Sequence, residues 1–463
     1  MARVDFLGVL MRFLWIVACL VLSACAEYQP KPLDAAGLAA RFDARTLSDP
    51  ALRAYIERES GQAVAGPAVR WNRQMLTLAA GFYSPALAVA RAQQQQAQGG
   101  ILAAGARPNP TLAFPFEYEL NHQGEGKPYT TGPALTWTVE TGGKRAARLH
   151  QAAASAAAAQ SNVLDVAWKV RSQVRAALLG VFAQGRRSAL LADKAGDLQR
   201  SVDLLDHRLL AGAIALPDLR RAQLLLAQAE SELAAAQVAL ADARARLATA
   251  IGVPVAALDG VQFDFTEFER AFAAPAPADA RRRAILHRAD LGVALAEYEA
   301  GQAALLQEVA RQYPDIQLGA GYSYDAGASK IGFGLAGITL PVFDKNGGAI
   351  AQAEAKRTEL AARAEALQAA ILNELDNGLT RYRAGTDRLE RAARQAASAA
   401  RQRDSVNASF AVGASDRLEL TQAQIDFQSF ALDHLNAVVA LQEAAGLLED
   451  AMQQALPAAP ASL

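Results

Sequence analysis

Two stretches of sequence, GAIALPDLRRAQ at residues 212–223 and GASDRLELTQAQ at residues 413–424, repeat one pattern 201 positions apart (413 minus 212). Each begins with Gly-Ala, has an acidic residue six places after the glycine, and ends with Ala-Gln. Three more pairs of landmarks follow in the same order at offsets of 204 or 205 positions: Ser84 with Arg288, Pro110 with Pro314, and Gly142 with Gly347. A repeat of this length indicates a duplicated domain half rather than a short solenoid unit.

The composition of the 463-residue chain is typical of long helices, since it is rich in Ala, Leu, Gln and Arg and only 6% aromatic. Its formal net charge of -1 gives no electrostatic basis for binding nucleic acid, so we expect no nucleic-acid partner. The two cysteines, Cys19 and Cys25, both lie near the N-terminus. Disulfides are therefore not expected to hold the fold.

Residues 1–24 have the order of a secretory signal peptide, with basic residues before an apolar run and small residues after it. Translation can begin at Met1 or at Met11. The segment LSAC at residues 22–25 is similar to a bacterial lipobox, which implies cleavage before Cys25 and acylation of that residue. The alternative is an ordinary N-terminal anchor with an incidental cysteine. Ala26 follows the cysteine where Asp would imply retention in the inner membrane, so the resemblance favours the outer membrane.

Each half of the repeat is predicted to contain a helix, two strands, a long helix, a tip and a returning helix. In the first half, residues 76–252, the leading elements span 85–106, 111–119, 133–140 and 144–210, with the tip at 210–219. In the second half, residues 284–452, they span 290–311, 316–324, 331–340 and 349–411, with the tip at 411–420 and a last helix to about residue 455. An N-terminal arm (25–75), a linker (253–283) and a tail (453–463) complete the division.

The long helices carry a heptad seam, because leucine recurs every seven residues after the first tip and alanine follows three positions later. These residues are Leu219, Leu226, Leu233, Leu240 and Leu247, with Ala222, Ala229, Ala236, Ala243 and Ala250. The same register after the second tip gives Leu420, Phe427, His434, Leu441 and Leu448, with Ala423, Phe430, Ala437, Ala444 and Ala451. Alanine is also dense away from the seam, which favours packing of each helix against more than two neighbours.

The four predicted strands are too few to close a barrel, and they need partners because the sequence offers no helix to cover them. No segment after the signal peptide has about 20 uninterrupted apolar residues, so a membrane crossing would need a closed barrel. Three copies would supply twelve strands, enough for a water-filled pore. The number three is an inference and is not contained in the sequence.

The duplicated plan and the two tips resemble the TolC-type outer membrane efflux channel family over about residues 76–452. Two junctions, VETGGKRAAR at 139–148 and LPVFDKNGGAIAQAEA at 340–355, are most similar to the branch that serves heavy-metal (cobalt-zinc-cadmium type) cation efflux. The segment WNRQMLTLAAGFYSPALAVARA at 71–92 also resembles that branch. The resemblance implies a mostly α fold with a small β part. Long antiparallel coiled-coil helices would form a periplasmic α-barrel, and four strands per chain would contribute to a trimeric, twelve-stranded outer membrane β-barrel.

The resemblance also implies partners and site residues. The partners would be two further copies in a homotrimer, outer membrane lipid, a periplasmic adaptor (membrane fusion) protein and an inner-membrane pump of the resistance-nodulation-division type. The aperture residues would be Glu419, Asp416 and Gln422. Gln422 stands where some family members have a second acidic residue, so the ring would be thinner here. The tips that dock on the adaptor would include Gly212, Asp218, Gly413, Ser415 and Arg417.

Glu419 is the main candidate for a role in conduction. Three copies would place three carboxylates around one opening, where their repulsion favours opening and their charge favours cations over anions. The alternative is a solvated residue on the flank of a coiled coil. The second tip is also more charged than the first, and we expect it to form the gate, while the first tip, with Pro217, is the stiffer flank.

Enzymatic chemistry finds little support in the sequence. Gly332, Gly334 and Gly337 form a lone G-x-G-x-x-G inside a predicted strand, which is the wrong context for a dinucleotide site. The five histidines are scattered, and no metal-ligand cluster or cofactor is expected. We therefore predict a passive exit duct of a tripartite efflux system, with metal cations as cargo. The alternatives are export of organic compounds or drugs through the same architecture, and a periplasmic coiled-coil scaffold without a pore.

Overall fold

The computed structural model describes residues 28–61, 69–121, 123, 126–270, 272–273, 275–325 and 328–457. The predicted signal peptide and the predicted lipidation site Cys25 lie outside these residues. The chain divides after Arg45 into two compact units. The first contains helix α2 (Ala35–Asp43), whose first amides are capped by the carboxylate of Asp34. The second, residues 46–463, contains the remaining described helices and strands.

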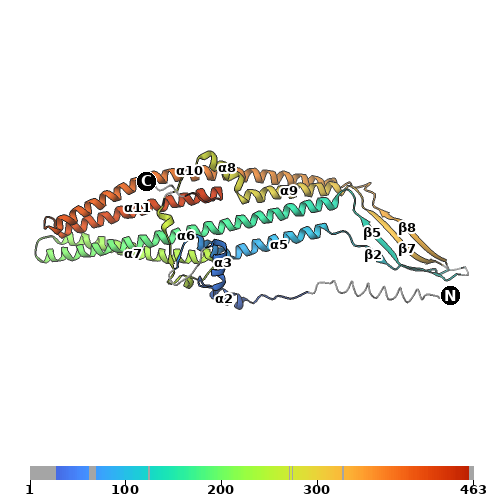
Figure 1. Ribbon diagram of the computed structural model, residues 1–463, viewed down its shortest axis with the longest axis horizontal. Helices are drawn as coiled ribbons and strands as arrows, with labels where there is room; N and C mark the ends of the chain where they lie inside the picture. The colour runs from blue at the N-terminus through green and yellow to red at the C-terminus, as the bar shows by residue number, and fades with distance from the viewer. Residues whose placement is uncertain are drawn as a thin grey trace. The chain divides into compact units, whose positions relative to one another are not determined.

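Four long helices form two antiparallel hairpins in the second unit (Figure 1). Helix α6 (Lys144–Leu210) returns as α7 (Leu216–Ile251), and α10 (Gly347–Ala411) returns as α11 (Arg417–Met452). The span of α6 agrees with the prediction, and α10 begins two residues earlier than predicted. The hairpins pack together through α6 and α11, which gives the order α7, α6, α11, α10 across the wall of helices.

Shorter helices flank the strand-side half of the hairpins. Helix α5 (Pro85–Gly105) packs on α6, and α9 (Ala289–Ala310) packs on both α6 and α10. Helices α3 (Pro50–Ser60) and α4 (Arg73–Tyr83) pack on each other, and α4 also packs on α6. Among the described residues no single helix is long and apolar enough to cross a membrane. The bent pair α4 and α5, at 56° to each other, passes that test together on length and composition alone.

The predicted linker at 253–283 is folded and contributes to the core. It contains the short 3₁₀ helices η1 (Val255–Leu258) and η2 (Thr266–Glu269) and helix α8 (Pro277–His287), which the sequence did not predict. Strand β1 (Arg70–Trp71) pairs in parallel with β6 (Gln262–Phe263). Phe268 is 1% exposed in the apolar cluster that α4, α6 and α7 share. This segment therefore ties α3 and α4 to the first hairpin.

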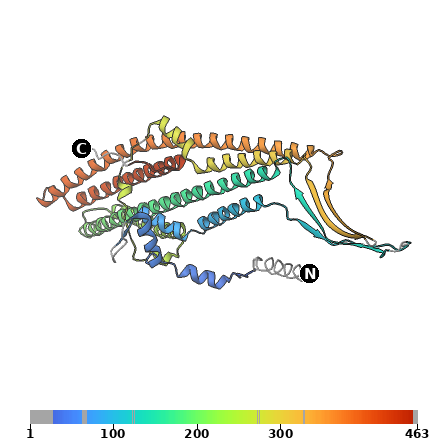
Figure 2. The same cartoon turned by 45° about the vertical axis from the view of Figure 1, so that its right-hand side comes forward.

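One antiparallel sheet extends from the end of the long helices that lies opposite the hairpin tips, and it curves away from them (Figure 2). It contains β2 (Thr111–Ala113), β3 (Phe116–Tyr118), β4 (Tyr129–Thr131), β5 (Ala134–Val139), β7 (Ile316–Asp325) and β8 (Ala328–Ile338). β2 pairs with β5 and β3 with β4; both β4 and β5 pair with β7, which pairs with β8. The strand predicted at 111–119 is broken at Pro115, which lies between β2 and β3. The strand predicted at 133–140 is confirmed as β5, and a separate short strand, β4, precedes Pro133. Both prolines fall between strands because proline has no N–H for the ladder.

The two faces of this sheet differ in chemistry. The register aligns one cross-strand row that is apolar: Leu112, Leu135, Ala320 and Phe333. The neighbouring row, whose side chains point to the other face, is small or polar: Thr111, Thr136, Gly319 and Gly334. On the apolar face Phe333 is 82% exposed and Ile331 86% exposed. An exposed apolar face of this kind indicates contact with an apolar environment. The glycines of the G-x-G-x-x-G stretch lie within β8, as expected from the sequence.

The start of α10 differs from the start of α6. Gly347 already belongs to the helix, and Asn346 takes the left-handed conformation with φ 62°. Asn346 tolerates this conformation because its side chain is fixed locally, with Nδ2 donating to Glu308 O and Oε2, each at 2.9 Å. Gly143, with φ 75°, occupies the same capping position before α6. The residue that caps α10 therefore lies two positions earlier than the repeat offset of 205 would place it (143 plus 205 is 348, against 346).

The heptad seam is confirmed along α7, where Leu219, Ala229 and Leu247 are buried. On α11 it is confirmed at both ends, with Leu420 and Leu448 buried, but it is wrong at Phe430, which is 38% exposed. Helix α11 packs on α6 as well as on α10, and the additional contact buries Gln428 instead. The burial pattern in the middle of α11 therefore reflects packing against both α6 and α10, and a single heptad seam does not describe it.

Candidate functional site

The two hairpin tips have the same backbone geometry. Two residues after the last residue of α6 and of α10 lies a glycine with a left-handed conformation, Gly212 at φ 71° and Gly413 at φ 75°. The following amide donates back to a carbonyl in the last turn: Ala213 N to Arg208 O and Ala414 N to Ser409 O, both at 2.8 Å. These bonds satisfy carbonyls that a helix end leaves open. A residue with a Cβ is strained at such a position, which explains why the repeat carries glycine at both tips.

The returning helices start differently at the two tips. Asp416 precedes α11, and its carboxylate accepts a 2.8 Å hydrogen bond from the Glu419 amide. Ala215 precedes α7 and provides no side-chain cap, while Pro217 lies in the first turn. An acidic residue at this position stabilises a helix start through the hydrogen bond and through the helix dipole. At the second tip the Asp416 carboxylate therefore stabilises the start of α11, in addition to being exposed to solvent.

An ion pair joins the two tips. Arg208 Nη2, at the end of α6, lies 2.7 Å from Asp416 Oδ2. The Arg208 guanidinium, and after it the Glu419 amide, hold the pKa of the Asp416 carboxyl below its ordinary value. Asp416 had been predicted to act with Glu419 at an aperture. That role stays a prediction. Within one chain the Asp416 carboxylate is paired with Arg208 of the neighbouring hairpin, so it links the two hairpins.

A second polar contact joins the hairpins further from the tips. Asp197 of α6 and Gln428 of α11 are both buried, and Gln428 Nε2 donates to the Asp197 carboxylate. Arg200 also pairs with Asp197 from one turn further along α6. Separating the tip halves of the two hairpins would therefore expose a carboxylate and break both of these contacts, Asp197–Gln428 and Arg208–Asp416.

A groove of about 580 Å³ lies between the hairpins and brings together four of the predicted site residues: Asp218, Asp416, Glu419 and Gln422. Glu419 and Gln422 also line a second groove, between α10 and α11, together with Asp426 and Gln402. Gln422 Nε2 donates to Asp426 Oδ1 at 2.9 Å. The two grooves share one wall, formed by the first two turns of α11. Glu419 therefore borders both grooves, whose walls also contain the carboxylates of Asp218, Asp416 and Asp426.

The remaining predicted tip residues lie outside both grooves. Arg417 is exposed, and its guanidinium carbon lies 5.9 Å from the centre of the Phe410 ring. Ser415 is half-buried in the turn before α11. Gly212 and Gly413 are exposed, and nothing lies within 4 Å of a Cβ built on either. These residues form the outer surface of the tips rather than the walls of the grooves.

Asp416→Asn is expected to loosen the tips more than Asp218→Asn, because only Asp416 has an ion pair across the hairpins. A carboxyl whose folded pKa is lowered stabilises the structure above its unfolded pKa and loses this effect as the pH falls through the folded pKa. The contact should therefore persist at neutral pH and weaken only below the ordinary Asp value of 3.8. Single-channel recording of both variants across pH measures how each substitution changes channel opening. Equal effects of the two substitutions would contradict the expected division between the tips.

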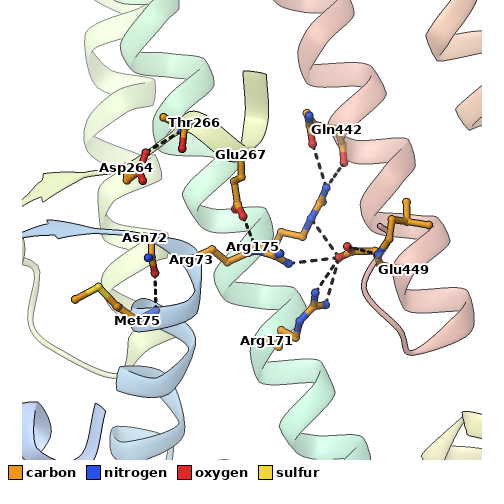
Figure 3. A network of polar contacts seen from close by, with 11 residues as sticks. Asn72, Arg73, Met75, Arg171, Arg175, Asp264, Thr266, Glu267, Gln442 and Glu449 are labelled. Carbon is orange, nitrogen blue, oxygen red and sulfur yellow. Dashed lines mark hydrogen bonds and ion pairs between the residues drawn. The ribbon is translucent and has the colours of Figure 1, made fainter. Parts of the chain in front are cut away.

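A buried charge network that was not predicted from the sequence lies midway along the hairpins (Figure 3). Glu449 of α11 is 1% exposed, and its Oε2 faces three guanidinium groups. The distances are 3.2 Å to Arg171 Nη2, 3.5 Å to Arg175 Nε and 3.5 Å to Arg73 Nη1. The other oxygen of Glu449 accepts from the Leu456 amide at 2.9 Å. One carboxylate thus joins α4, α6 and the end of α11.

The network continues into the folded linker. Arg73 Nε donates to Glu267 Oε2 at 2.8 Å, and Arg175 Nη2 donates to the Gln442 carbonyl at 2.8 Å. Gln442 Nε2 donates in turn to Phe268 O at 2.9 Å. Burial lowers the pKa values of Arg171 and Arg175, and the Glu449 carboxylate opposes this shift. The network therefore supports the wall of helices and is remote from the tips.

No group of three or more His, Cys, Asp or Glu side chains that could hold a metal ion is found in the parts of the chain that the structure describes.

Two duplicated hairpins with an acidic groove at their tips, continued by one sheet with an apolar face, have the architecture of an outer membrane channel subunit. This chain belongs to the outer membrane efflux protein family, whose model matches residues 83–253 and 280–453. The matched residues make up most of the chain, and they locate the protein in the outer membrane as an efflux duct.

Known relatives agree with this assignment. The chain is 28% identical over 290 residues to the cobalt-zinc-cadmium resistance protein CzcC of Cupriavidus metallidurans, which covers 61% of this chain and 67% of that protein. The crystal structure of VceC from Vibrio cholerae has a TM-score of 0.67 at 20% identity and covers 83% of this chain and 96% of VceC. A crystal structure of CusC has a TM-score of 0.66 at 17% identity and covers 93% of this chain and 99% of CusC. The two structures show that the fold is shared.

Proposed function

We propose that this chain forms, as a homotrimer, the passive exit duct of a tripartite system that exports metal cations. The observation that carries the proposal is one exposed stripe along α11. It contains Glu419, Gln422, Asp426, Ser429, Asp433, Asn436 and Glu443. Their spacing of three and four residues, with seven from Asn436 to Glu443, places them on one face of the helix.

The charged side chains of the stripe itself are all acidic. From Glu419 to Glu443 it contains four carboxylates, and α11 has no Lys or Arg after Arg417. At 1.5 Å per residue it extends over roughly 36 Å. A row of one sign of charge along a narrow passage raises the local concentration of the opposite sign. The relative named for resistance to cobalt, zinc and cadmium supports divalent metals as the cargo.

The other partners follow from the same architecture. The six strands of the sheet form four rows, because β2 is followed by β3 and β4 by β5 along the same line. The sheet ends at β2 and β3 on one side and at β8 on the other, and an open edge of this kind favours pairing with another chain. Three copies would give the twelve strands of a water-filled barrel whose apolar face meets outer membrane lipid. The tips at Gly212 and Gly413 would dock on a periplasmic adaptor that connects to an inner-membrane pump. Acylation of Cys25 would add a lipid anchor.

Glu419→Gln tests the proposal at the narrow end of the duct. Removing one carboxylate per chain should lower the cation-to-anion permeability ratio by roughly two- to fivefold, since nearby charges in water-filled passages interact by about 1 kcal/mol. Reversal potentials in planar bilayers measure the ratio with potassium and with zinc chloride. Glu59→Gln on α3, which removes an exposed carboxylate remote from the tips, is the matched control.

Two results would contradict the proposal. Absence of conductance in the purified, assembled protein would exclude a duct and favour a scaffold. A deletion strain that remains resistant to cobalt, zinc and cadmium but becomes sensitive to organic compounds would exclude the metal cargo and retain the duct.

A further inference from the structure

Glycine lines much of the polar face of the sheet. The register places Gly319 beside Gly334 and Gly321 beside Gly332, and directly paired residues of antiparallel strands share one face. Nothing lies within 4 Å of a Cβ built on Gly332 or on Gly334, so packing does not require glycine at either position. Because glycine weakens a strand, its use there indicates a wall that is kept clear of side chains.

The charged side chains of this face lie at the end of the sheet that is remote from the long helices (Figure 2). Glu117, Thr130 and Asp325 form one cross-strand row. Asp325 lies four positions after Gly321 on β7, so the row belongs to the glycine face. Lys330 of β8 belongs to the same face, two positions before Gly332.

The carboxylate of Asp325 is paired within the chain. Lys330 Nζ lies 2.6 Å from Asp325 Oδ2, and Thr130 Oγ1 donates to Oδ1 at 3.0 Å. Glu117 differs from it, since the Glu117 side chain is exposed and has no hydrogen bond or ion pair within the part of the chain that the structure describes. At this end of the sheet the charge of Asp325 is therefore cancelled, and that of Glu117 is not.

The charge balance at this end of the sheet is negative. The five charged residues among the described parts of 116–130 and 321–332 are Glu117, Glu119, Lys127, Asp325 and Lys330. Three are acidic and two are basic, which gives a net charge of -1 per chain (2 minus 3).

A hollow of about 240 Å³ lies beside Glu117 on the glycine face, where the chain bends between β4 and β5. Its lining includes Thr130, Ser323, Gly321 and Gly332, and among the described residues that form it Glu117 alone is charged. One carboxylate beside hydroxyl and backbone groups attracts a hydrated cation but does not retain it. Conduction requires attraction of this weak kind.

We infer that Glu117 sets the preference for cations at the outer mouth of the duct, at the end opposite to Glu419. The inference rests on the proposed trimeric duct, in which three copies of Glu117 face one opening. The glycine wall adds no competing charge, and Lys330 cancels the charge of Asp325. Cations that have passed the tips therefore meet a second region of favourable potential, and anions outside meet a barrier.

Single-channel currents in planar bilayers test this role at low salt, where fixed charges act over about 30 Å, against about 3 Å at 1 M salt. In channels inserted from one chamber, Glu117→Gln should lower the potassium current that enters at the sheet end by about twofold in about 10 mM salt. The current that enters at the tips should change little. Glu419→Gln should act on the opposite direction of current, so the two variants should rectify with opposite sign.

Two further variants serve as controls. Asp325→Asn with Lys330→Gln removes a neutral pair and should leave the current unchanged. Gly332→Asp adds a carboxylate to the hollow at a position where a side chain meets no neighbour, so it should restore the current of the Glu117→Gln channel.

The outcomes separate this inference from the proposed function. A Glu117→Gln channel that conducts like the parent in both directions at low salt, while Glu419→Gln lowers cation selectivity, would overturn the role of Glu117 and leave the duct standing. An equal loss of current in both directions would overturn its place at the outer mouth. Absence of conductance in the assembled parent protein would overturn both proposals.

Discussion

Glu449→Gln should lower the free energy of unfolding by about 3–5 kcal/mol, because it leaves three buried or partly buried guanidinium groups without their shared counter-ion. Glu449 is 1% exposed, and its Oε2 lies within 3.5 Å of Arg73, Arg171 and Arg175. Burial lowers the pKa of Arg175, so this side chain depends on Glu449 to remain charged at low cost. Thermal or denaturant unfolding, followed by helical circular dichroism, measures the loss.

The chain offers a matched control on the same helix. Glu443 lies six residues before Glu449 and is exposed, so Glu443→Gln should change stability by less than about 0.5 kcal/mol. Removing Arg175 together with Glu449, as Arg175→Met with Glu449→Gln, should recover part of the lost stability, since fewer unpaired charges remain buried. A loss below about 1 kcal/mol for Glu449→Gln would show that water or rearrangement replaces the carboxylate.

The long helices and the tips could be predicted because their signals are local. No proline interrupts residues 144–210, and the seam of α7 repeats every seven residues. Glycine six places before an acidic residue identified both tips, and the structure places both glycines in the left-handed region. Such features depend on neighbours within a few turns, and one sequence contains them in full.

The polar contacts between elements could not be predicted from the sequence. Arg171, Arg175 and Glu449 resemble solvated residues of long helices, and 274 positions separate Arg175 from Glu449 (449 minus 175). Arg73 and Glu267 lie in segments that were predicted as an arm and a linker. The pairing of Arg208 with Asp416 depends in the same way on how one hairpin packs on the other. The strand breaks at Pro115 and Pro133 could have been predicted from the prolines themselves. The alternation of aromatic residues around them favoured continuous strands instead.

Gly142→Ala should destabilise the joint between the sheet and the helices by about 2–5 kcal/mol, from left-handed strain and overpacking together. Gly142 has φ 64°, and a Cβ there would lie 2.8 Å from Ala310 O and 2.9 Å from Tyr313 Cβ. Neither neighbour can yield easily, because one is backbone and the other is the base of a side chain. Polar contacts also hold the joint together, since the Thr141 amide donates to Asp315 at 3.0 Å and Lys144 Nζ lies 2.7 Å from the same carboxylate.

Gly143→Ala separates the two contributions. Gly143 has φ 75° but nothing within 4 Å of its Cβ position, so alanine there should cost only the left-handed strain of about 1–2 kcal/mol. The difference in unfolding free energy between the Gly142 and Gly143 variants measures the cost of overpacking against the end of α9. Because this joint sets the direction of α6 from β5, the Gly142 variant should also assemble less trimer than the Gly143 variant. Equal unfolding free energies and equal trimer yields would show that the joint relaxes, and the angle between sheet and helices would then have to be fixed at the β8–α10 junction instead.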